Sequence, residues 1–106
     1  MTRNPTSITK KSMKEQADAL EELGWRLERA WKKGLGQRDE TLARIVEDAR
    51  FHAAVLVVLP VETWTEEYAQ ETMRAAKEAF KLGSERLMWI DPDMLNHAYR
   101  IAGASE

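Results

Sequence analysis

Apolar residues recur every three or four positions through most of the chain, which is the spacing of one face of an α-helix. Ser12 and Glu15 match a capping box, and Gly34 with Gly36 supplies a stop, so we expect a first helix over 12–33. Its apolar line has spacings of 4, 3, 4, 3 and 4: Met13, Ala17, Leu20, Gly24, Leu27 and Trp31. The small members of this line predict that a neighbouring helix approaches closely there.

A second periodic segment begins at Asp39, a plausible helix cap, and ends before Pro60. Its line of residues is Leu42, Ile45, Ala49, His52, Leu56 and Leu59. Further valines surround this line, so the second half of the predicted helix 39–59 is apolar on every side. A helix of that kind is buried on every side, and we expect it to be central in the fold.

A third segment starts at Thr63 and Glu66, which repeat the capping-box pattern, and runs to Gly83. We expect a helix over 63–82, with an apolar face wide enough to contact two neighbours. The pair Asp91-Pro92 predicts the start of a short fourth helix.

The fold class predicted from these segments is all-α, a small antiparallel bundle of about four helices. The fourth helix would span 92–102, and residues 84–90 would form a connector or an extra turn. Because the loops are short, consecutive helices should be neighbours.

An α/β alternative stays open at this point. Residues 55–59 and 86–90 are short apolar runs, and periodicity does not separate a buried strand from a buried helix at that length. As strands they would flank the helix 63–82 in a right-handed β-α-β unit. Two strands alone make a poor sheet, and the chain offers no third candidate, so the helical interpretation is favoured.

The length of 106 residues fits one domain, which we place at 12–106 after a flexible N-terminal arm over 1–11. Apolar residues are 43% and charged residues 32% of the chain, a globular balance. The charge is uneven: residues 1–38 hold nine Lys or Arg against five Asp or Glu, whereas 39–106 hold seven against thirteen. Such a dipolar chain suits charged partners.

Several classes of protein are disfavoured by composition. There is no cysteine, which excludes disulfides and thiolate chemistry. No apolar run approaches the roughly 20 residues needed to cross a bilayer, and residues 1–11 are too polar for a secretory signal. We therefore expect a cytoplasmic protein without membrane contact.

No motif for catalysis, a cofactor or a metal is found. The two histidines, His52 and His97, each follow an aspartate by four residues, but neither belongs to a set of ligands with metal-site spacing. Neighbouring acidic residues diverge by about 100° around a helix and do not face each other. We expect no enzyme, no cofactor and no metal site.

Binding of another protein is the function expected from the sequence, in a small regulatory, adaptor or inhibitor protein, together with a homodimer. Trp25 falls off the apolar line of the first helix, so it is either covered by another part of the fold or faces outward, and exposed tryptophans are enriched as binding anchors. Arg26, Arg29 and Lys33 share a helical stripe. These four residues form the predicted partner-binding site. The alternative is a nucleic-acid-binding regulator that uses this basic stripe, although the sequence pI of about 5.8 is acidic.

Overall fold

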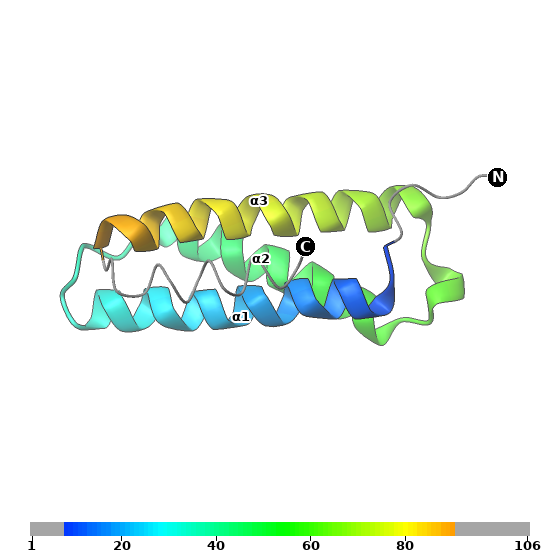
Figure 1. The fold of residues 1–106 in the computed structure, drawn as a ribbon, viewed down its shortest axis with the longest axis horizontal. Helices are drawn as coiled ribbons and strands as arrows, with labels where there is room; N and C mark the ends of the chain where they lie inside the picture. The colour runs from blue at the N-terminus through cyan, green and yellow to red at the C-terminus, as the bar shows by residue number, and fades with distance from the viewer. Residues whose placement is uncertain (1–7, 91–106) are drawn as a thin grey trace.

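The computed structural model describes residues 8–90, which form an all-helical bundle. Its elements are helix α1 (Lys10–Lys32), helix α2 (Glu40–Val58), the short 3-10 helix η1 (Val61–Thr63) and helix α3 (Glu66–Ile90). Each long helix packs against the other two, and consecutive helices run in opposite directions (Figure 1). The all-α class is confirmed with three long helices in this part of the chain, and the predicted fourth helix lies outside the described residues.

The first helix starts earlier than the sequence pattern indicated. The hydroxyl of Thr9 accepts a hydrogen bond from the Ser12 backbone N–H at 3.0 Å, and the Ser12 hydroxyl oxygen accepts one from the Thr9 N–H at 2.9 Å. These reciprocal bonds form the capping box, so the predicted box of Ser12 with Glu15 is wrong. The last two residues of the predicted arm therefore belong to α1.

Helix α2 begins as expected but is not buried on every side. The Asp39 carboxylate accepts a hydrogen bond from the Leu42 N–H at 3.0 Å and caps the helix. Leu42 and Leu56 face the core, whereas the side chains of Phe51 and Val58 are 58% and 80% exposed. Two neighbouring helices cover only part of the circumference of α2, which corrects the expectation of a fully central helix.

Helix α3 starts at a different cap from the predicted one. The Thr65 hydroxyl accepts a hydrogen bond from the Tyr68 N–H at 3.1 Å, so the helix begins at Glu66. Thr63 instead donates its hydroxyl proton to the Pro60 carbonyl at 2.7 Å, within the turn that holds η1. The predicted capping box of Thr63 with Glu66 is therefore wrong.

Helix α3 also continues through Gly83, where the sequence predicted a stop. A Cβ atom on Gly83 would lie 2.5 Å from Leu23 Cδ2, so this glycine lets α3 approach α1 closely. The close approach predicted at Gly24 is absent, since a Cβ there would meet only Val46, at 3.8 Å. Residues 84–90 are thus helical, and the predicted connector is wrong.

The α/β alternative is also excluded for the described residues. The apolar run at 55–59 lies in the last turn of α2 and its cap, and the run at 86–90 forms the last turns of α3. Neither segment pairs as a strand anywhere in residues 8–90. Within these two runs, Leu56 and Leu87 are buried in the helical core.

The core consists of two clusters along the bundle. The larger one gathers leucines of α1 with α2 and α3, and its fully buried members include Leu20, Leu27 and Leu87. The smaller one lies at the other end and includes Met13 and Leu56. Burying one such side chain contributes about 1.5–3 kcal/mol, so the apolar line predicted for the first helix is a main source of stability.

Candidate functional site

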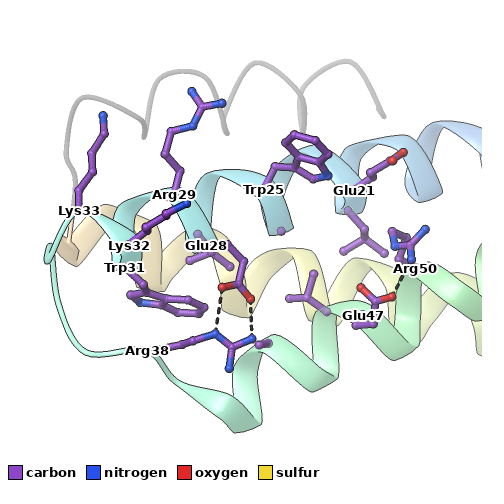
Figure 2. A pocket seen from close by; sticks show the side chains of 15 residues that line it. Glu21, Trp25, Glu28, Arg29, Trp31, Lys32, Lys33, Arg38, Glu47 and Arg50 are labelled. Carbon is purple, nitrogen blue, oxygen red and sulfur yellow. Dashed lines mark hydrogen bonds and ion pairs between the residues drawn. The ribbon is translucent and has the colours of Figure 1, made fainter.

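A groove of about 1070 Å³ runs between α1 and α2 and contains most of the predicted partner-binding residues (Figure 2). Its apolar lining comes from both helices: Leu20, Gly24, Leu27, Trp31, Ala43 and Val46. Gly24 widens the groove because it presents no side chain, and a Cβ atom at this position would have its nearest neighbour, Val46 Cγ1, 3.8 Å away. We call this surface the Trp25 groove after the aromatic residue that lines it.

Trp25 is the largest exposed side chain of the groove. It is 67% exposed, although it lies on the same helix as the fully buried leucines. In Figure 2 its indole lies on the same side of α1 as the side chains of Arg29 and Lys33. An aromatic ring beside cationic groups and an apolar floor is the usual composition of a protein-binding anchor.

The predicted stripe of cations is only partly available. Arg26 is half-buried, donates from Nε to the Glu22 carboxylate at 2.9 Å, and does not line the groove. Arg29, Lys32 and Lys33 are exposed, line the groove, and make no ion pair with any residue between 8 and 90. The groove thus contains Trp25, Arg29 and Lys33 of the predicted set and adds Lys32.

Arg38 closes the end of the groove near the α1–α2 loop. Its guanidinium donates from Nε and Nη2 to the two carboxylate oxygens of Glu28, at 2.9 and 2.6 Å, and also pairs with Glu40. It lies 5.9 Å from the ring centre of Trp31, close enough for a cation–π contact. These contacts hold α1, the loop and the start of α2 together.

The same contacts shift the pKa values of Glu28 and Arg38. The hydrogen bonds from Arg38 hold the pKa of Glu28 below its ordinary value, and the pKa of Arg38 is raised by its bonds to Glu28 and Glu40. At the opposite end, Arg50 donates to Glu47 at 2.6 Å, which raises the pKa of Arg50. Glu28 and Glu47 are therefore paired with arginines, and the three unpaired cations of the groove outnumber its remaining carboxylate, Glu21.

Sequence reasoning missed the side of the groove that α2 supplies. Ala43, Val46, Glu47 and Arg50 follow one another at helical spacing, but nothing in that pattern indicates which helix faces them. Arg38 was missed because its partner Glu28 lies ten residues away, across a loop. The sequence signal in this region is the pair Gly34 and Gly36, which predicts a loop and which Arg38 follows. In the structure the two glycines adopt φ values of 84° and 89°.

Metal sites, buried titratable side chains and membrane spans can each be checked in the described part of the chain. Residues 8–90 contain no cluster of three or more His, Asp or Glu side chains suited to a metal ion. Their buried polar side chains are Gln16 and Thr72, neither of which is titratable. No helix among them is long and apolar enough to cross a membrane.

Comparison with known proteins gave no match to a family model, to a curated protein or to a solved structure.

Proposed function

We propose that the protein is a non-catalytic binding module that holds an acidic, amphipathic segment of another protein in the Trp25 groove. One observation carries this proposal: Trp25 is 67% exposed beside an apolar groove whose unpaired charges at one end are cationic. A solvent-exposed tryptophan gains more free energy from burial in an interface than almost any other side chain.

Two chemical features of the groove select the partner. The apolar floor under Gly24 and Leu27 accepts aliphatic or aromatic side chains. Arg29, Lys32 and Lys33 at one end favour carboxylates, and Arg29 offers a planar fork that binds a carboxylate with two hydrogen bonds.

Nucleic acid is the weaker candidate for this surface. The groove cations without an ion pair among residues 8–90 are Arg29, Lys32 and Lys33, gathered at one end, so the surface could neutralise only a few phosphates. Arg26, the first residue of the predicted basic stripe, is bound to Glu22. An apolar floor also contributes nothing to contacts with a phosphate backbone.

A displayed library of random helical peptides, selected on the purified protein, tests the proposal. We expect enrichment of sequences that combine Asp or Glu with large apolar residues. Trp25→Ala should weaken the selected peptides by about 2 kcal/mol, roughly thirtyfold. Phe51→Ala, which truncates an exposed aromatic residue of α2 outside the groove, is the matched control and should leave binding unchanged.

Charge reversal gives a second test. Lys32→Glu should weaken the acidic peptides, whereas Lys77→Glu on α3 makes the same charge change away from the groove and should have little effect. Enrichment of basic peptides, or an equal effect of Trp25→Ala and Phe51→Ala, would reject the proposal. Tight binding of duplex DNA or RNA that Lys32→Glu abolishes would favour the nucleic-acid alternative instead.

A further inference from the structure

A second exposed apolar surface lies on the side of the bundle formed by α2 and α3. On α3, every seventh residue points to solvent: Tyr68, Ala75, Leu82 and Trp89. Trp89 is 80% exposed. A spacing of seven keeps side chains in line along a helix and is the repeat by which a second helix packs alongside.

Helix α2 contributes to the same surface. Ile45 is partly exposed and shares a hollow of about 440 Å³ with Leu82 and Trp89. We call the surface made by Ile45 and the four α3 residues the Trp89 face. It is separate from the Trp25 groove, since the two surfaces have no lining residue in common.

The charges beside the Trp89 face are mainly negative. Glu71, Glu78 and Glu85 each follow a residue of the apolar line by three positions, so they lie one turn away on the same side of α3. Glu71 is paired with Arg74, whereas Glu78 and Glu85 make no ion pair with any other residue from 8 to 90.

The cations near this face offset that row of carboxylates only in part: Lys81 lies three positions after Glu78 and four before Glu85, within one turn of both. Arg86 is engaged by the Asp39 carboxylate at 2.9 Å. On α2, the exposed Asp48 balances the charge of Arg44.

We infer that the Trp89 face docks a basic amphipathic helix of a partner protein. Its apolar residues would pack between α2 and α3 along the seven-residue repeat. Its Lys or Arg side chains would meet Glu78 and Glu85. Charge complementarity decides the occupant, because a second copy of this chain docked face to face would bring two rows of carboxylates into one interface, which is destabilising. The protein would then join an acidic partner and a basic partner through two different sides.

Two synthetic peptides of about three heptads test this inference. Both carry leucine on the seven-residue repeat, and one bears Lys and Arg at the flanking positions where the other bears Glu. Calorimetry with the full chain should show binding of the basic peptide, at least tenfold tighter than the acidic one. Equal affinity for both peptides, or no binding of the basic one, would overturn the inference.

Substitutions locate the site. Trp89→Ala should weaken the basic peptide about tenfold or more, as expected for an aromatic anchor, and Phe51→Ala should not. Glu85→Lys should weaken it as well, whereas Glu15→Lys, the same charge change on α1, should not. Circular dichroism of each variant confirms that the helices are intact. Equal losses in the test and control variants would contradict a defined site.

The mass of the free protein provides an independent check. Sedimentation of the wild type and of Trp89→Ala should give the same molecular mass. A dimer that Trp89→Ala converts to a monomer would show that a second copy occupies this face, and the assignment to a basic helix would then be wrong.

Discussion

The indole Nε1 of Trp64 donates a hydrogen bond to the backbone carbonyl of Leu56 at 3.0 Å. In a regular helix this carbonyl would accept from the N–H of the residue four positions later, but that residue is Pro60, which has no N–H. Trp64 thus satisfies the carbonyl that the helix-ending proline leaves open. The contact also joins the turn around η1 to the end of α2.

Replacing this indole tests the arrangement. Trp64→Phe keeps an aromatic ring but removes the donor, and we expect the free energy of unfolding to fall by about 1–3 kcal/mol. Chemical denaturation followed by circular dichroism measures the change. Trp25→Phe is the control, because Trp25 is exposed and its loss should alter stability by less than about 0.5 kcal/mol. Equal stability of the two variants would show that the bond contributes nothing.

Two helical glycines give a pair of opposite predictions. At Gly24 an added methyl group meets only Val46 Cγ1, at an ordinary contact distance of 3.8 Å. Gly24→Ala should therefore raise the free energy of unfolding by about 0.5–1 kcal/mol, the difference in helix propensity.

At Gly83 the same methyl group would lie 2.5 Å from Leu23 Cδ2 and 3.2 Å from Leu23 Cγ. Gly83→Ala should destabilise the bundle by about 1–3 kcal/mol, because α3 must move away from α1 or Leu23 must leave its rotamer. Thermal melts of both variants decide the question. A stabilised Gly83→Ala protein would mean that the two helices do not approach closely there.

Acid should weaken the junction of α2 with α3. The hydrogen bond from the Leu42 N–H and the charge of Arg86 hold the pKa of Asp39 below its ordinary value. The stabilisation is therefore fully present above the unfolded aspartate pKa of about 3.9, and it is lost as pH falls through the lowered pKa of the folded state.

Urea unfolding between about pH 6 and about pH 2.5 measures this dependence. Asp39→Asn keeps a capping side chain but does not titrate, so its stability should fall less steeply over that range than the stability of the wild type. Identical slopes would show that Asp39 does not contribute to the acid response.

A charged side chain placed in the core should strongly reduce the stability of the protein. Leu56 is 1% exposed and lies in the smaller cluster at the end of the bundle. Leu56→Asp would bury an unpaired carboxylate at a cost of several kcal/mol, comparable with the whole stability of a domain this size. We expect a protein that is unfolded or insoluble. A soluble variant with an unchanged melting temperature would place Leu56 at the surface.

Periodicity in the sequence predicted the helices but not their limits. The line through Leu20 and Leu27 was assigned to the core and is buried there, because the spacing of apolar residues depends only on local geometry. Gly83 was misread as a stop, since a glycine at a helix end and one at a helix crossing look alike in sequence. Only the position of Leu23 on another helix distinguishes them.

Sequence reasoning likewise predicted only part of the candidate site. The position of Trp25 off the apolar line and the cationic stripe were visible in the helical pattern of α1, but the exposure of Trp25 was left open. The opposite wall of the groove required knowledge of which face of α2 lies beside them. The Trp89 face was missed because Tyr68, Ala75 and Leu82 were read as part of the wide apolar face that packs inward, whereas Trp89 lay beyond the predicted helix 63–82. Self-association stays a prediction. Leu23, which lies off the apolar line predicted for the first helix, is covered by packing within the bundle and adds no exposed apolar surface for it.

The indole N–H signals of the tryptophans offer the most direct test of the proposed function. The chain has four tryptophans, and single Trp→Phe variants assign their signals in a proton–nitrogen correlation spectrum. Titration with an acidic amphipathic peptide from the library should shift the Trp25 signal and leave the Trp89 signal in place. Binding that shifts Trp89 and not Trp25, or no shift of either signal at saturating peptide, would contradict the assignment of the Trp25 groove as the partner-binding site.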